Sequence, residues 1–151
     1  MAERRGSQDA FFKDIFDEMH HASHIFPEAS NETVTLTAGD PENTNGAWAE
    51  IVDNNAVTLS SKFASAEGHL HSLQVEGVSA KKKVFVLEIA YGDDKTQVLH
   101  LRFLENNKSV PIQQNRVLSN DIPAGETIYY RMMCEDADAT CTVSIRYHIF
   151  S

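Results

Sequence analysis

The residues best suited to bind a metal are histidines near the N-terminus. His20 and His24 are four residues apart, so a helix would place both imidazoles on one face, as in half of a zinc site. His69 and His71 alternate on an expected strand and would share one of its faces. No further ligand pair occurs at a recognisable spacing. We therefore expect surface or interface histidines, no metal and no cofactor; a metal-dependent enzyme using His20, His24 and a strand histidine is the third hypothesis.

The two cysteines, Cys134 and Cys141, lie on two strands that we expect to pair as a hairpin. In the register given below they face each other, so a cross-strand disulfide is geometrically feasible. The alternative, which we favour, is two small buried thiols kept reduced in a cytosol. The neighbouring carboxylates of Glu135, Asp136 and Asp138 disfavour a thiolate and therefore a nucleophilic role.

Signatures of catalysis are missing from the sequence. It has no Gly-x-Ser-x-Gly elbow and no phosphate- or dinucleotide-binding glycine pattern. The acidic clusters at 92–94 and 135–138 lack the spacing of a calcium loop and are typical of solvated turns. Trp48, the only tryptophan, could stack on a sugar, but we expect it in the core. The sequence therefore predicts a protein that is not an enzyme.

The chain is acidic and has the length of one domain. Its 151 residues include 13 Lys and Arg against 22 Asp and Glu, a net charge of −9. Phosphate backbones and anionic membranes repel such a charge, so we expect neither nucleic acid nor a membrane as partner. No apolar run approaches the roughly 18 residues that span a bilayer, and no secretory signal is recognisable.

The N-terminal residues have the pattern of an amphipathic helix over about 8–22. Ser7 suits the N-cap, and Pro27 prevents the helix from continuing. One stripe of this helix carries the large apolar side chains that we expect to bind a partner: Phe11, Phe12, Ile15, Phe16 and Met19. Residues 27–46 are rich in Pro, Gly and polar residues, which is typical of a connector, with one short strand at 33–37.

After Gly46 the apolar residues alternate with a period of two. We therefore expect a mainly β protein with two parts, a helical arm and connector over 1–46 and an antiparallel β-sandwich or jelly-roll-like domain over 47–151. No helix is expected in the second part. Its candidate strands are 48–52, 56–59, 69–75, 84–91, 97–104, 116–118, 127–134 and 141–150.

Two hairpins follow from this alternation. In the first, 127–134 pairs with 141–150 so that Cys134 faces Cys141 and every apolar side chain falls on one face. Its outer face would then carry a cross-strand contact between Tyr129 and Arg146. In the second, 84–91 pairs with 97–104 through a turn at 92–95. Because the outer face of 84–91 carries the apolar residues Val84, Val86 and Ala90 as well as Glu88, both faces can be partly covered, and we expect this strand to be central or to lie at a subunit contact.

Several segments from Thr35 onwards are similar to those of small β-rich structural proteins of tailed bacteriophages. They are 35–39, 46–53, 59–63, 88–93 and 122–132. The resemblance is one of style rather than of a catalytic signature, so it assigns no residue a role. It implies a β-sandwich with an N-terminal anchoring arm, as in capsid decoration (cement) proteins or head- and fibre-attached modules.

The expected function is that of a non-enzymatic virion structural protein, assembled in the host cytoplasm. We expect a symmetric homo-oligomer, with a trimer among the states considered, whose arm binds the major capsid protein or another virion protein. The alternative is a carbohydrate- or receptor-binding β-sandwich module at a fibre tip or on a cell surface. The sequence leaves the position within the virion and the state of the two cysteines open.

Overall fold

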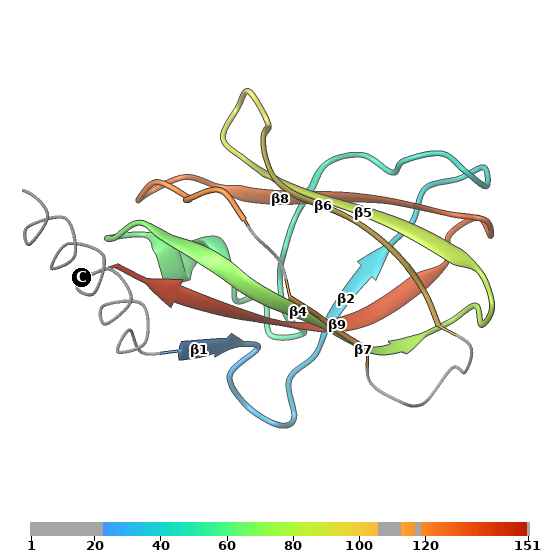
Figure 1. Ribbon diagram of the computed structural model, residues 1–151, viewed down its shortest axis with the longest axis horizontal. Coiled ribbons are helices and arrows are strands. Elements are labelled where there is room, and N and C mark those ends of the chain that lie inside the picture. Colours follow the sequence, from blue (N-terminus) through green and yellow to red (C-terminus); the bar gives the residue numbers. More distant parts are fainter. Residues whose placement is uncertain (1–22, 106–112, 117–118, 151) are drawn as a thin grey trace, which may run out of the picture.

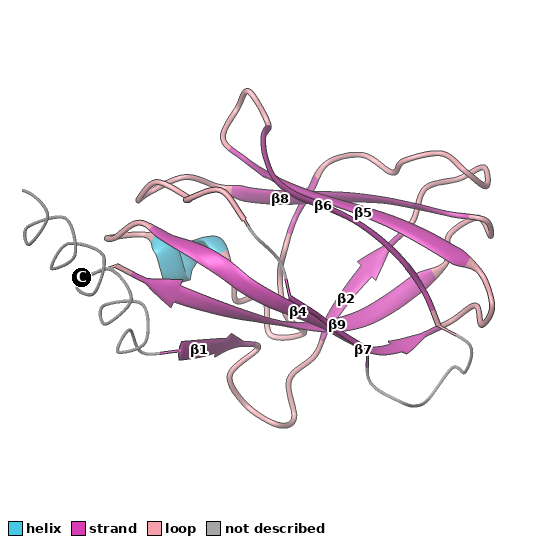
Figure 2. Cartoon of the chain, in the orientation of Figure 1, coloured by secondary structure: helices cyan, strands magenta, loops and turns pink. Residues whose placement is uncertain are grey.

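The computed structural model, which describes residues 23–105, 113–116 and 119–150, consists of two antiparallel β-sheets packed face to face (Figure 1). A short 3₁₀ helix, η1 (Ser60–Phe63), lies at one end of the two layers (Figure 2). The five-stranded sheet contains β1 (Ser23–Phe26), β2 (Val34–Thr37), β9 (Thr140–Ile149), β4 (Gly68–Val78) and β7 (Gln113–Arg116). The four-stranded sheet has the order β3 (Ala49–Glu50), β8 (Ile128–Cys134), β5 (Val84–Tyr91) and β6 (Thr96–Leu104).

The core lies between the two sheets and is built from alternate residues of each strand. In β8 buried and half-buried residues alternate without interruption, as the period of two predicts. The rings of Phe85 and Phe103 stack with their centroids 5.2 Å apart. Val143 and Ile145 contribute from the opposite sheet and are at most 1% exposed. The mainly β, antiparallel class expected from the sequence is confirmed.

The predicted hairpin at 84–104 is present. Phe85 pairs with Phe103 and Leu87 with Leu101, and the register shifts at a bulge after Ile89. The turn residues Gly92 and Lys95 have φ angles of 77° and 54°, in the left-handed region that tight turns use. Because β8 pairs with the other edge of β5, β5 is a central strand, as the apolar residues on both of its faces had suggested.

The predicted hairpin between 127–134 and 141–150 is wrong. β8 pairs with β5, so that Cys134 lies opposite Phe85, whereas β9 pairs with β4, β1 and β2 in the other sheet. Each strand does bury the face that its alternation predicted. In a hairpin the two apolar faces lie side by side in one sheet, whereas after a crossover they face each other across the core. Both faces are buried in either arrangement, so the period of two cannot distinguish the two arrangements. The expected contact between Tyr129 and Arg146 is lost for the same reason, and Tyr129 pairs with Ala90.

The segment interpreted as a connector belongs to the sandwich. The short strand expected at 33–37 is β2, and both β1 and β2 pair with β9. Gly39 and Gly46 each donate a backbone N–H to the carbonyl oxygen of Met132, at 3.1 Å. The sandwich therefore includes residues from Ser23 onwards rather than from 47, while the helix expected over 8–22 lies outside the described residues.

Two smaller differences concern the loop between β3 and β4. Instead of a strand at 56–59, the structure has one isolated bridge between Val52 and Thr58. The helix η1 was not expected, and it buries Phe63 completely. A single buried ring in a polar segment gives too little periodicity to predict such a helix.

We expect Gly39→Ala to destabilise the protein by about 1–3 kcal/mol, because an added Cβ would overlap the Thr44 carbonyl and the Gly46 backbone. Gly46→Ala is the matched control, since its Cβ would approach the Gly39 backbone no closer than 3.6 Å and should cost much less. Urea unfolding of both variants measures the difference. Equal stabilities would contradict the integration of this segment into the sandwich.

Candidate interaction surfaces

The residues predicted to bind a partner, Phe11, Phe12, Ile15, Phe16 and Met19, lie outside the described residues. The structure does show how the first described strand, β1, is attached to the sandwich. Ser23 pairs with His148 and Phe26 with Ile145, at the end of β9. Phe26 is 1% exposed and anchors β1 in the core, whereas the preceding side chain, Ile25, is 42% exposed. Phe26 thus holds β1 in the sandwich, while Ile25 of the same strand presents an apolar side chain at the surface.

Three histidines gather on the outer face of the five-stranded sheet beside β1. Because Leu70 and Tyr147 point into the core, their strand neighbours His69 and His148 point outward. The ring of His148 lies 5.0 Å, centroid to centroid, from the rings of both His69 and His71. His69 and His71 were expected to share a face, but His148 was missed because the pairing of β4 with β9 joins residues far apart in the sequence.

The metal hypothesis linked these residues to the N-terminal histidines. His24 stacks instead on the core residue Tyr147, with ring centroids 5.3 Å apart, and His20 lies outside the described residues. Within the part of the chain that is described, no three His, Cys, Asp or Glu side chains are arranged to hold a metal ion.

Trp48 lies on the outer face of the four-stranded sheet rather than in the core, where we expected it. The guanidinium carbon of Arg131 lies 4.5 Å from the centre of the indole ring. The Nη2 atom of Arg131 is 3.4 Å from each carboxylate oxygen of Glu88, on the neighbouring strand. An indole, a guanidinium and a carboxylate thus form one layer on this face. The half-buried Trp48 keeps part of its surface open to a ligand.

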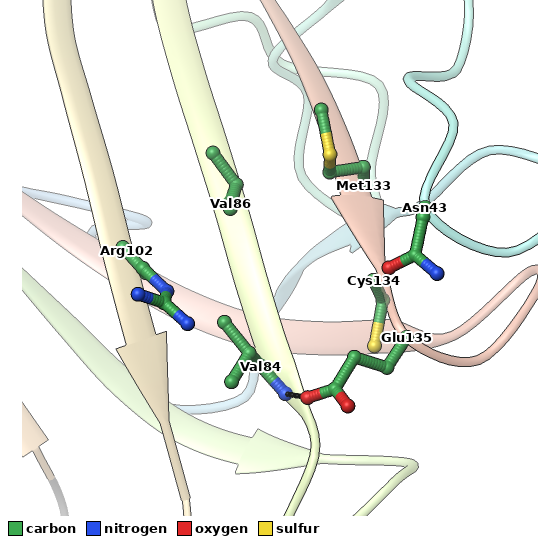
Figure 3. Close-up of a pocket in the computed structure, with 7 residues that line it drawn as sticks. All are labelled: Asn43, Val84, Val86, Arg102, Met133, Cys134 and Glu135. Carbon is green, nitrogen blue, oxygen red and sulfur yellow. Dashed lines mark hydrogen bonds between the residues drawn. The ribbon is translucent and has the colours of Figure 1, made fainter.

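A shallow depression of about 610 Å³ lies on the same sheet, one strand row away from this layer. We call it the β5 depression. Its lining comprises Asn43, Val84, Val86, Arg102, Met133, Cys134 and Glu135 (Figure 3). One carboxylate oxygen of Glu135 accepts a hydrogen bond from the backbone N–H of Val84, at 2.6 Å. The depression therefore combines an apolar floor with one basic and one acidic side chain.

The two cysteines are free thiols, each 1% exposed. They lie on strands of different sheets, and the Cys141 sulfur is 3.7 Å from the sulfur of Met132. Burial, with a smaller contribution from Cys134, raises the pKa of Cys141 to about 12. Burial also raises the pKa of Cys134. Both groups are therefore poor nucleophiles at neutral pH.

A second, smaller cavity of about 80 Å³ lies among acidic side chains near β1. The carboxylate of Asp53 accepts the backbone N–H groups of Asn55 and Val57, at 2.8 and 2.9 Å. Burial opposes the ionisation of Asp53, but these hydrogen bonds outweigh it and lower its pKa. Glu28 forms an ion pair with Lys62 at 2.7 Å. Asp53 thus holds the loop between β3 and η1, and Glu28 ties the loop after β1 to η1.

We expect neither thiol of the native protein to react with a thiol reagent such as DTNB at neutral pH, because both are buried and protonated. In denaturant both should react, giving two thiols for each chain. Absorbance of the released thiolate measures this directly. Fewer than two reactive thiols in denaturant without a reductant would show that a disulfide forms in the isolated protein.

Comparison with known proteins gives little guidance. No family model and no curated protein matches the sequence. Among solved structures, a chain of infectious bursal disease virus, Gt strain, is similar over 85% of this chain and 33% of its own, with 13% identity and a TM-score of 0.37. A chain of the Gx strain is similar over 84% and 32%, with 12% identity and a TM-score of 0.32. The chain thus spans about a third of the length of these viral chains, and a likeness this low carries no conclusion about function. In the described residues no helix has the length and apolar character needed to cross a membrane.

Proposed function

We propose that this chain is a non-enzymatic virion structural protein of a tailed bacteriophage, most simply a capsid decoration (cement) or other head-associated protein. Its sandwich forms a homo-oligomer, and its N-terminal segment fastens it to the major capsid protein or another virion protein. The virion, assembled in the host cytoplasm, is its place of action. The observation that carries the proposal is the order of strands in the two sheets.

That order supports a jelly roll. β2 pairs with β9 and β4 with β7 in one sheet, while β3 pairs with β8 and β5 with β6 in the other. These are nested pairs, as in one long hairpin that has been rolled up. β4 with β9 and β5 with β8 then join the pairs into sheets. Eight strands arranged in this way are used by viral capsid domains and by lectins, and β1 is an addition.

The N-terminal segment supports the choice of a structural role. Burying the five predicted partner-binding side chains is worth on the order of 8–12 kcal/mol, before the cost of ordering the chain. The first described strand, β1, is fixed to β9, so the segment before Ser23 leaves the sandwich from a fixed point rather than from a flexible connector.

Deletion of residues 1–22 should leave the sandwich folded, because every described strand is retained. We expect the truncated protein to keep its unfolding transition but to lose attachment to virions, as measured by co-sedimentation with particles that lack the native protein. Phe11→Ser/Phe16→Ser in the full chain is the matched variant and should also weaken attachment.

Two results would contradict the proposal. Purified virions that do not contain the protein would exclude the virion role. Undiminished attachment of the truncated protein would exclude the N-terminal segment as the anchor.

The second candidate is a carbohydrate- or receptor-binding module, because jelly rolls also serve as lectins and Trp48 is on the surface. The indole would stack on a sugar ring while Glu88 or Arg131 binds its hydroxyl groups. In that case a glycan screen should find a ligand whose binding is lost in Trp48→Ala but partly kept in Trp48→Phe. Isothermal titration with the ligand found would measure the loss. A screen without ligands would remove this candidate.

A further inference from the structure

We propose that two copies of this chain meet through the outer face of the four-stranded sheet, about a two-fold axis that runs along β5 across the β5 depression. This inference deepens the homo-oligomer of the proposed function and rests on it. What carries it is the placement of Arg102 and Glu135 on opposite sides of an apolar floor.

The floor is formed by side chains that share the outer face. Val84 pairs with Leu104, and Val86 pairs with both Arg102 and Met133, so these residues lie in two adjacent rows across three strands. The residues between them, Phe85 and Phe103, point into the core, which places the rows on the outside. Leu104 is 41% exposed, and Val84, Val86 and Met133 are half-buried. Covering this apolar surface with another protein surface would lower the free energy, because it removes apolar area from water.

The charges lie at the two edges of this floor. Arg102 is on β6 and Glu135 follows β8, with Val84 of the central strand between them (Figure 3). Arg102 is exposed and forms no ion pair with the described residues. One oxygen of Glu135 accepts the Val84 N–H, and its side chain is exposed. Neither charge neutralises the other within one chain.

A second copy matches this pattern by symmetry. A two-fold axis that lies in the interface and bisects the line between the two charges brings Arg102 of each chain over Glu135 of the partner subunit. A uniformly acidic or basic partner would pair one charge and oppose the other. Two copies also carry like net charges of −9, and a local pairing of opposite charges at the contact offsets part of the resulting repulsion.

Charge reversal tests this geometry. Arg102→Glu and Glu135→Arg should each raise the dissociation constant of the dimer by about tenfold or more, because like charges then meet twice across the axis. An equimolar mixture of the two variants should recover association as a heterodimer, since both contacts become favourable again. Analytical ultracentrifugation of the full-length variants, each alone and then in the equimolar mixture, measures their association.

Two controls separate charge at the depression from effects on folding. Arg146→Glu and Glu76→Arg change the charge equally at exposed positions of the five-stranded sheet and should leave association unchanged. Glu135→Gln keeps an oxygen that can accept the Val84 N–H and removes only the charge, so it should weaken the dimer without lowering stability. A circular dichroism melt of each variant checks its fold.

A monomeric wild-type chain overturns the inference. So does an oligomer, a trimer included, that forms equally well in the reversal variants, or a mixture without heterodimers. In the last two cases virion attachment through residues 1–22 is untouched, so failure of this interface is distinct from failure of the proposed function.

Discussion

The structure depends on one constraint, which is that each long strand has a single apolar face and must bury it against the other sheet. Phe85, Leu87 and Ile89 of β5 and Leu73 of β4 are completely buried in the core between the two sheets. Main-chain pairing joins strands within a sheet, but it is the shared core that holds the two sheets together. The three histidines around His148, the contact of Trp48 with Arg131 and Glu88, and the β5 depression lie on the outer faces of the sheets, which this requirement leaves free.

The constraint also explains which parts of the fold the sequence predicts. The strands β5, β6, β8 and β9 are long and their apolar residues alternate, so their existence and their buried faces could be predicted. The existence of β4 could be predicted too, but two register shifts interrupt its alternation. The β5–β6 hairpin could be predicted as well, because Gly92 and its neighbours form a short turn. The pairing of strands that are joined by a crossover could not be predicted. Alternation shows that the side chain of Met132 points inward, but not which strand pairs with β8.

The same limit applies to the surfaces. Trp48 stands at the start of an irregular segment in which only two residues form strand β3, so alternation there is too short to show which way its ring points. The histidine cluster needs His148, which is separated from His71 by 77 positions and meets it only because β4 pairs with β9. By contrast, the outer position of Glu88 could be predicted, since it interrupts a long and regular strand. The N-terminal stripe that the sequence singled out lies outside the described residues and remains a prediction.

The attachment of β1 has a mechanical consequence. Its four residues pair antiparallel with β9, from Ser23 opposite His148 to Phe26 opposite Ile145. Hydrogen bonds between strands lie across the strand direction. A pull on residue 22 along the strand axis therefore loads these bonds together in shear, whereas a sideways pull opens them one after another, starting at Ser23. The buried Phe26 ring lies at the far end of β1, so in either case its packing in the core is the last contact of β1 to resist the force.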